Sequence, residues 1–503
     1  MSEAKTLSRL EAGTLLLVGG NRAIEVSPTL AAAFRPGDEI VAVERTGDVL
    51  HLPAAEVEIA RASVTRAHEA FRAMNSVSDD QIRRFFGEFA QRLSDDSIWS
   101  RIEETNRRDV EDARARGRST TRLETSNAMR NAMIDGLRVW ADAHSVRGRV
   151  LETVEHGSWK AELVGAELGV VAFVFEGRPN VVADATGVLR SGNTVVFRIG
   201  RDALGTAKSI VELAVEPALV AAGLPVGAVT VVDSAAHAAG WALFRDRRLS
   251  LAVARGSGPA VDTLGSFAQS AGVPVSLHGT GGAWLFVSSS TSPDQLTQNV
   301  FDSLDRKVCN TMNTCCILRS QASALVPAFV AGLTRAAARR ETEFKLHVAR
   351  GSESFVASEL FDEQVEIGRA EGVVREALAE LLDVDQLGHE WEWENSPEVT
   401  LVVVDSIEEA VGLFNAQSPQ FVACLLSTDA SEQARFYSAV NAPFVGDGFT
   451  RWVDGQYALS RPELGLSNWE NGRLFGRGGI LAGDIVFTVR TRVTGTSAGK
   501  PVS

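Results

Sequence analysis

Four cysteines in 503 residues are too few for a disulfide framework. They lack the paired CxxC spacing of a zinc site, and the eight histidines do not cluster near them. Positive charge is also short, because 50 lysines and arginines stand against 64 aspartates and glutamates, a formal net charge of −14. The sequence therefore predicts reduced thiols, no metal, and no nucleic-acid partner, since the basic footprint of such proteins is missing.

Long apolar runs are absent as well. No run reaches the ~18 residues that indicate a membrane helix, and the first residues do not have the pattern of a signal peptide. We expect a cytoplasmic protein that does not bind membranes. There is no internal repeat and no low-complexity linker, and the length predicts about three domains at ~150 residues each.

The first 56 residues predict a small β-rich unit. Residues 14–18 form a strand candidate, and residues 40–43 and 49–52 flank a turn as a short hairpin. A unit of this size forms only a marginal hydrophobic core by itself. We therefore expect it to pack on the main body or on a partner. Its role is not indicated by the sequence.

Helical periodicity begins near residue 54. The sequence SDDQ at residues 78–81 is a capping box, which starts a helix. Five apolar residues then follow at helical spacing and predict one buried stripe: Ile82, Phe85, Phe86, Phe89 and Leu93.

From residue 170 onward, short apolar strands alternate with helices, which predicts a parallel sheet with crossover helices. The strand candidates are residues 170–175, 194–197, 229–232 and 251–254. Such sheets bind ligands at the carboxyl ends of their strands, so this part predicts a nucleotide-binding domain. After residue 275 a second α/β unit begins, with strands at 284–287 and 399–404. A late strand at 485–493 pairs either with a hairpin at 151–164 or across a subunit boundary.

Cys309 is the candidate nucleophile. It follows Arg306 and Lys307, and nearby cations favour the reactive thiolate. The alternative is a buried structural cysteine with both basic side chains pointing to water, because unpaired cysteines are among the most buried residues. No histidine at a recognisable spacing supports a protease-like dyad.

Other candidates follow the strands of the first sheet. The glycine turn that contains Gly256 and Gly258 lets a helix N-terminus approach a phosphate, and the SGN turn at 191–193 is similar. Arg198, at a strand end, is placed to meet a ribose or a 2′-phosphate. His278, at the domain junction, is by itself more often a structural histidine.

Together these segments resemble the aldehyde dehydrogenase superfamily and, within it, the glutamate-5-semialdehyde dehydrogenase (gamma-glutamyl phosphate reductase) family. The resemblance extends over residues 57–493 and leaves residues 1–56 outside. The segments that carry it share their order with the family: NRRDVEDARARG at 106–117, LGVVAFVFEGRPNV at 168–181, SGNTVVFR at 191–198, VCN at 308–310, VVDSIEEA at 403–410 and TRWVDG at 450–455.

The resemblance implies an α/β, aldehyde dehydrogenase-like fold in three parts. A Rossmann-like cofactor domain comprises residues 57–150 and 167–275, and an α/β catalytic domain comprises residues 276–480. Residues 151–166 and 481–496 form a β-flap for oligomerisation, and residues 1–56 are a small β-rich extension. The implied assembly is a homo-oligomer, a dimer or a tetramer.

The implied reaction is NADPH-dependent reduction of an acyl phosphate, with NADP preferred over NAD. Cys309 attacks the acyl carbonyl, and the Cys309 amide and the Asn180 side chain stabilise the oxyanion. The other implied roles are cofactor binding by Arg198, Gly256, Gly258 and Glu394, and substrate binding by Arg178, His278, Asn310, Thr450 and Arg451.

The chain departs from the family around its nucleophile. Leu304, Asp305, Arg306 and Lys307 replace the usual QRPG, and Asn313 replaces a glutamate. The segment LHGTG at 277–281 keeps only the histidine and the last glycine of EHLDG, and it lacks the superfamily's general-base glutamate. The exact acyl substrate is therefore open. The alternatives are a reductase of another activated acyl group such as a thioester, an aldehyde oxidiser, and a non-catalytic scaffold of the same fold.

Overall fold

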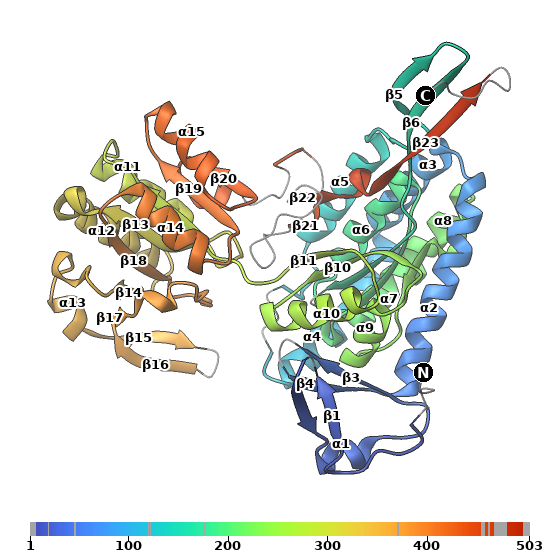
Figure 1. The fold of residues 1–503 in the computed structure, drawn as a ribbon, viewed down its shortest axis with the longest axis horizontal. Helices are drawn as coiled ribbons and strands as arrows, with labels where there is room; N and C mark the ends of the chain where they lie inside the picture. Colours follow the sequence, from blue (N-terminus) through green and yellow to red (C-terminus); the bar gives the residue numbers. More distant parts are fainter. Residues whose placement is uncertain are drawn as a thin grey trace. The chain divides into compact units, whose positions relative to one another are not determined.

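A computed structural model describes residues 7–495, apart from residues 19, 45–46, 119, 121, 176, 370–371, 454–457, 461–462 and 467–479. The chain divides into two compact units, and most of their elements are labelled in Figure 1. The first unit comprises Met1–Gly279, Ser460–Gly465 and Leu481–Ser503, and the second comprises Thr280–Leu459 and Leu466–Ile480.

Two antiparallel hairpins and a short helix precede the main body. They are β1 (Leu15–Val18), β2 (Arg22–Glu25), α1 (Pro28–Ala33), β3 (Glu39–Val43) and β4 (Asp48–Leu52). The strand and the hairpin expected here are confirmed. Val43 and Leu52 are buried in one core cluster with Val170 of the large sheet. The second hairpin therefore belongs to the core of the first unit and is not a detached extension.

Four helices follow: α2 (Ala54–Ala73), α3 (Asp79–Ser94), α4 (Asp96–Ala115) and α5 (Asn127–Asp142). The capping box is confirmed, because the Gln81 amide donates to Ser78 Oγ at 3.3 Å and the Ser78 amide donates to Gln81 Oε1 at 3.0 Å. All five residues of the predicted apolar stripe of α3 are buried.

The core of the first unit is a five-stranded parallel sheet in the order β11-β10-β7-β8-β9. Its strands are β7 (Val170–Phe175), β8 (Thr194–Ile199), β9 (Val229–Val231), β10 (Leu249–Arg255) and β11 (Val275–His278), and its helices are α6 (Val181–Thr186), α7 (Leu204–Ile210), α8 (Glu216–Ala222), α9 (His237–Phe244) and α10 (Gly258–Ser270). The chain adds β8 and β9 on one side of β7 and then β10 and β11 on the other. This reversal between β7 and β10 is the switch point at which doubly wound sheets bind ligands.

A separate three-stranded antiparallel sheet contains β5 (Val150–His156), β6 (Trp159–Glu167) and β23 (Phe487–Gly495). β23 pairs with β6 over its whole length, from the pair Phe487–Glu167 to the pair Gly495–Trp159. Of the two pairings that the sequence left open, the structure shows the one with the early hairpin.

The second unit is built on a seven-stranded parallel sheet in the order β17-β14-β18-β13-β12-β19-β20. Its strands are β12 (Ala283–Val287), β13 (Met312–Leu318), β14 (Lys345–Ala349), β17 (Ala379–Leu382), β18 (Glu398–Val404), β19 (Val422–Leu426) and β20 (Phe444–Gly446), and its helices are α11 (Pro293–Ser303), α12 (Ala322–Ala338), α13 (Glu359–Asp362), α14 (Ile407–Gln417) and α15 (Ala430–Ala439). The second unit also contains the hairpin β15 (Gln364–Arg369) with β16 (Gly372–Ala377), whereas most residues of β21 (Glu463–Leu466) and β22 (Ile480–Ala482) belong to the first unit. The predicted α/β class is confirmed.

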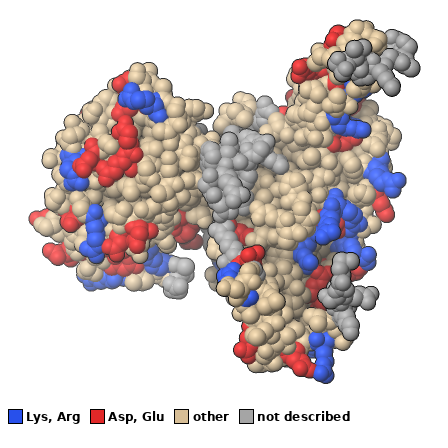
Figure 2. All heavy atoms as spheres, viewed as in Figure 1, with Lys and Arg blue, Asp and Glu red and all other residues tan. Residues whose placement is uncertain are grey.

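The helices and the surface charge bear on whether the protein resembles a membrane protein or has a strongly charged binding face. None of the helices in the described ranges combines the length and the apolar character needed to cross a membrane. On the face shown in Figure 2, acidic and basic side chains are interspersed on both units, with wide uncharged areas between them.

Candidate active site

Cys309 differs from the other three cysteines in its burial. It lies in the loop between the end of α11 and the start of β13 and is half-buried, whereas Cys315, Cys316 and Cys424 are buried within strands. Burial raises the pKa of these three thiols, which disfavours their thiolate forms. No disulfide joins any of the four. Cys309 is therefore the thiol best suited to act as a nucleophile.

Two glycines pack on the backbone of Cys309. The Gly282 amide donates to the Cys309 carbonyl at 2.7 Å. A Cβ atom at Gly281 would lie 2.5 Å from the Cys309 carbonyl oxygen and 2.6 Å from its Cα, which is closer than side-chain atoms approach backbone. The residue at 281 must therefore be glycine for the nucleophile loop to keep its position, which explains why this family glycine is retained.

The carboxylate of Glu390, whose side chain is 12% exposed, bonds to the same glycine turn. Glu390 accepts a hydrogen bond from the Gly281 amide at 2.5 Å and pairs with Lys307 Nζ at 2.5 Å. Burial raises the pKa of the Glu390 carboxyl, against the opposing effect of Lys307. Of the two cations expected near the thiol, Arg306 is exposed. The Lys307 side chain is only 8% exposed, so it does not point to water.

Asn313 positions the segment that carries Glu390. Its Nδ2 donates to the His389 carbonyl at 2.8 Å, and its Oδ1 accepts from the Trp391 amide at 2.8 Å. The Trp391 ring stacks on His347 with 3.5 Å between the ring centroids. Asn313 appears in the sequence as a departure from the family, and no sequence motif points to Glu390 or Trp391.

Three of the predicted substrate residues gather beside the Cys309 loop. Arg451 donates through Nε to Asp305 Oδ1 at 2.6 Å and through Nη1 to Asn310 Oδ1. The neighbouring Thr450 amide donates to Ser303 Oγ at 2.9 Å. The Thr450 hydroxyl is fully buried and has no hydrogen-bond partner among the residues that the structure describes, so it can still accept or donate to a ligand.

Glu394, predicted to bind the nicotinamide ribose, is exposed. Its carbonyl oxygen lies 3.5 Å from Arg340 Nη1, a contact of its backbone that does not involve the carboxylate. Its assignment remains a prediction, and Glu390 is the glutamate that the structure brings to the Cys309 loop.

In the first unit, the predicted residues Arg178 and Asn180 follow β7. Asn180 stands at the N-cap of α6, yet its side chain makes no capping bond there. Asp184, in the first turn of the same helix, is desolvated, which raises its pKa to about 6 against the attraction of Arg255 and Arg178. Arg178 follows β7, Asp184 lies on the helix after β7, and Arg255 ends β10, so these charged groups lie at the switch point of the sheet.

The predicted cofactor residues occupy the neighbouring strand ends. The Gly256 amide donates to the His278 carbonyl at 3.2 Å, and Gly258 begins α10 behind Ser257, which makes no side-chain cap. Arg198 is buried on β8, where Nη2 donates to the Ala235 carbonyl at 2.6 Å.

This donor set fits a dinucleotide. Burial lowers the pKa of Arg198, and its Nε has no hydrogen-bond partner among the described residues. A buried, unsatisfied N–H on a cation suits the hydroxyls or phosphate of a ribose. The uncapped amides at the start of α10 suit a phosphate. These are the residues that would hold the nucleotide.

The SGN turn, in contrast, has a structural role. Asn193 is buried, and its Oδ1 accepts from the amides of Leu168 and Gly169 at 2.7 and 2.9 Å. Its Nδ2 donates to the Val188 and Val486 carbonyls at 3.2 and 2.6 Å. All donors and acceptors of this amide are thus used to join the start of β7 to the segment before β23, and none is left for a phosphate.

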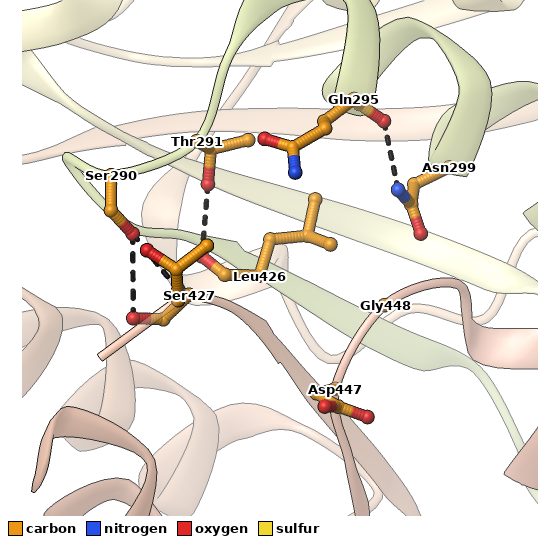
Figure 3. Close-up of a pocket in the computed structure, with 9 residues that line it drawn as sticks. Ser290, Thr291, Gln295, Asn299, Leu426, Ser427, Asp447 and Gly448 are labelled. Atoms are coloured by element: carbon orange, nitrogen blue, oxygen red, sulfur yellow. Dashed lines mark hydrogen bonds between the residues drawn. The ribbon is translucent and has the colours of Figure 1, made fainter. Parts of the chain in front are cut away.

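A cavity of about 230 Å³ lies elsewhere on the second sheet (Figure 3). The cavity is next to the carboxyl ends of β12 and β19, whereas Cys309 precedes the amino end of β13. Because these strands are parallel, the cavity and Cys309 lie at opposite ends of the strands. Its hydroxyls already bond to one another and to backbone: Ser290 Oγ is 3.5 Å from Ser427 Oγ, and Thr291 Oγ1 donates to the Leu426 carbonyl at 2.9 Å. The cavity is not part of the Cys309 site.

Known proteins resemble this chain in sequence and fold. The sequence profile of the aldehyde dehydrogenase family matches residues 38–344, so the match begins before residue 57, where the resemblance was predicted to start. A gamma-glutamyl phosphate reductase of Syntrophomonas wolfei is 27% identical over 358 residues, which cover 69% of this chain and 76% of the relative. One from Rhodospirillum rubrum is 26% identical over 400 residues, covering 78% and 85%.

The crystal structure of gamma-glutamyl phosphate reductase from Thermotoga maritima aligns with a TM-score of 0.75. It covers 88% of this chain and 99% of that chain at 22% identity, a likeness that bears on the fold. The predicted resemblance and the predicted fold are both confirmed.

Proposed function

Because the chain belongs to the aldehyde dehydrogenase family, whose members are NAD(P)-dependent oxidoreductases, we propose that it reduces an amino acid acyl phosphate to the semialdehyde through a thioester on Cys309. Glutamyl 5-phosphate is the proposed substrate, in proline synthesis, because several relatives are named gamma-glutamyl phosphate reductase. The changed residues around Cys309 leave room for a related amino acid acyl phosphate of a specialised pathway.

The state of Cys309 is the observation that carries this proposal. It is the half-buried cysteine, and Gly281 and Gly282 hold its loop in place. A thiolate adds readily to an activated acyl carbon, and phosphate is a good leaving group, so a thioester forms on Cys309. A general base that activates water would be needed only to hydrolyse this thioester. The absence of the superfamily's glutamate from residues 277–281 suits reductive release of the product.

The remaining roles are assigned to this chain's polar groups. The Cys309 amide and the Asn180 side chain donate to the tetrahedral oxyanion, and Asn180 makes no competing cap bond. The substrate's own polar groups are assigned to Arg178, His278, Asn310, Thr450 and Arg451. The buried Thr450 hydroxyl, to which no described residue bonds, supports this assignment most directly.

The cofactor, when bound, supplies a hydride to the acyl carbon. We propose NADP rather than NAD, held by Arg198, Gly256, Gly258 and Glu394, because a buried guanidinium with an unsatisfied N–H complements a 2′-phosphate. We further propose a cytoplasmic homo-oligomer, a dimer or a tetramer, that is assembled through the flap sheet of β5, β6 and β23.

The test is the reverse reaction, phosphate-dependent oxidation of glutamate semialdehyde with NADP⁺. Wild type is expected to require phosphate, and Cys309→Ser is expected to lose at least about a thousandfold in rate. Equal NADP⁺ reduction by both proteins would contradict the nucleophile assignment. A matched Cys424→Ser variant, which alters a buried thiol, controls for nonspecific effects of cysteine removal.

The same assay separates the alternatives. Replacing phosphate by a thiol acceptor such as coenzyme A tests a thioester reductase, and turnover without any acceptor tests an aldehyde oxidiser. Turnover only with other aldehydes would change the substrate and keep the mechanism. No turnover with any aldehyde, in a folded protein that binds NADP⁺, would favour the scaffold reading.

A further inference from the structure

We propose that the ion pair between Lys307 and Glu390 is a positioning device for Cys309, which holds the Gly281–Gly282 turn on the nucleophile and balances the charge beside its thiol. This inference rests on the proposed function only in taking Cys309 as the nucleophile. It assigns a role to two residues for which the sequence resemblance implied none.

The positioning part rests on a chain of short contacts. Lys307, two residues before Cys309, pairs with Glu390 Oε1 at 2.5 Å, and Glu390 Oε2 accepts from the Gly281 amide at 2.5 Å. Gly281 in turn contacts the Cys309 backbone so closely that no Cβ fits between them. The carboxylate therefore bridges the segment before the cysteine and the turn packed on it, and both oxygens are needed for the bridge.

The bridge is itself anchored to the sheet. Asn313, on β13, holds the backbone on both sides of Glu390, through the His389 carbonyl and the Trp391 amide. Trp391 Nε1 donates to Thr400 Oγ1 of β18 at 2.8 Å. Glu390 thus has a fixed location relative to β13, the strand that follows the nucleophile, and a fixed carboxylate positions better than a mobile one.

The charge part follows from the surroundings of the loop. Lys307 stands two residues before Cys309, and Glu390 bonds to the Gly281 amide of the turn that packs on the Cys309 backbone, so one positive and one negative charge belong to the surroundings of this loop. Glu392 Oε1 is 3.5 Å from Lys307 Nζ, but its side chain is 77% exposed, so water screens it. Arg306 is exposed, and Asp305 is paired with Arg451. Among the contacts that the structure describes, the Lys307–Glu390 pair therefore adds no net charge to the surroundings of the Cys309 loop.

A balanced pair predicts opposite effects for its two members. Glu390→Gln leaves Lys307 uncompensated, which favours the Cys309 thiolate, so alkylation by iodoacetamide at pH 7 should accelerate by roughly threefold or more. Lys307→Met leaves Glu390 uncompensated, so alkylation should slow by a similar factor. Both variants lose the bridge, and turnover should fall at least about tenfold in both. A merely structural role would not move alkylation in opposite directions.

The experiment measures the alkylation rate at Cys309 by intact-mass analysis of the full-length protein, from pH 6 to pH 9, beside kcat and KM in the reverse assay. The double variant Lys307→Met with Glu390→Gln removes both charges and should restore the wild-type alkylation rate while turnover stays low. Glu390→Asp keeps the charge but shortens the bridge, so alkylation should stay near wild type and kcat should fall. Glu392→Gln, the exposed neighbour, is the control and should change neither.

Each result decides the proposal. Alkylation shifts of the same sign in Glu390→Gln and Lys307→Met would overturn the charge balance, and unchanged kcat in Glu390→Asp would overturn the positioning. Should one single variant fail to fold, as circular dichroism reports, Glu390→Asp and the double variant still test both parts. Failure of the proposed function is distinguishable, because it would appear as Cys309→Ser retaining wild-type turnover, whatever the alkylation rates.

Discussion

The two sheets present their candidate chemistry at opposite ends of their strands. In the first unit, Asn180 and Gly256 follow the carboxyl ends of β7 and β10, where the strand order reverses. In the second unit, Cys309 comes before the amino end of β13, and the carboxyl ends of β12 and β19 border the hydroxyl-lined cavity instead. A general rule for parallel sheets thus locates the candidate residues of the first unit and does not locate the nucleophile.

The difference shows how each site is held. The candidate site of the first unit lies where any doubly wound sheet can bind a ligand. The Asn193 amide of this unit has a structural role, because it bonds the segment before β7 to the segment before β23. The second unit has to build the surroundings of Cys309 from separate segments near residues 281, 390 and 451. We expect local changes to affect chemistry in the second unit and stability in the first.

The largest effect expected from this comparison is that of Gly281→Ala. The added methyl group would lie within 2.8 Å of three atoms of Cys309, so the loop must move, and a shift near 1 Å costs about a hundredfold in turnover. The measurement is kcat in the reverse assay, with thermal unfolding as a check of the fold. Gly412→Ala on α14, where no atom lies within 4 Å of the new methyl group, is the matched control and should keep full activity.

Asn193→Ala should instead destabilise the first unit. It leaves two amides and two carbonyls without their partner in a buried place, which costs on the order of 3 kcal/mol in the free energy of unfolding. Urea denaturation measures the loss in the free energy of unfolding, and hydrogen exchange of the β7 amides shows whether the loss is local to that strand. Asn299→Ala, which removes an exposed amide bonded to the Gln295 carbonyl, is the control. A change below about 1 kcal/mol for Asn193→Ala would contradict its role as a tie.

Asp184→Asn tests the electrostatics of the switch point through pH. The pKa of Asp184 is raised to about 6, so the folded state holds this proton more tightly than the unfolded state, and stability falls as pH rises from 4 to 6. Asparagine does not titrate, so the stability of the variant does not fall at this position over the same pH range. The variant should therefore be more stable than wild type at pH 7.5, by on the order of 2 kcal/mol after allowance for partial exposure, and equal to it near pH 4. A difference that does not vary with pH would show that the carboxyl is not desolvated.

The smallest effect compares the units directly, because both contain the same capping box. Ser78 begins α3 in the first unit, and Ser292 begins α11 in the second, each with a glutamine three residues later. Ser78→Ala and Ser292→Ala should each cost about 1 kcal/mol, seen as faster hydrogen exchange in the helix concerned. Only Ser292→Ala alters the helix that leads to Cys309, so a change in turnover confined to this variant would sharpen the contrast between the units.

Much of the fold was predictable because it depends on local patterns. The stripe of α3, the hairpin of β3 and β4, and the four strand candidates of the first sheet all follow from the spacing of apolar residues. Residues 1–56 were less predictable, because the burial of Val43 and Leu52 depends on contacts with a sheet more than a hundred residues later.

The candidate site was predictable only in part, for the same physical reason. Cys309, Asn310 and Arg451 were found through motifs, and the structure brings them together. Glu390 was missed because its contacts with Gly281 and Lys307 join residues 109 and 83 positions apart. One signal was available: Gly281 is retained where its neighbours differ from the family, which indicates a position where no side chain fits.

The path of the chain through the two units also constrains how the protein is made. The first unit is entered at the start of the chain and completed only after the second, and Arg492 of β23 meets Glu162 of β6 across 330 positions. At ribosomal speeds of about 5 to 20 residues per second, β6 waits roughly 15 to 65 seconds for its partner strand. During this interval the edge of β6 and the Asn193 amide lack the partners that close them. The newly made chain therefore has an open strand edge that a chaperone or a neighbouring nascent copy can occupy.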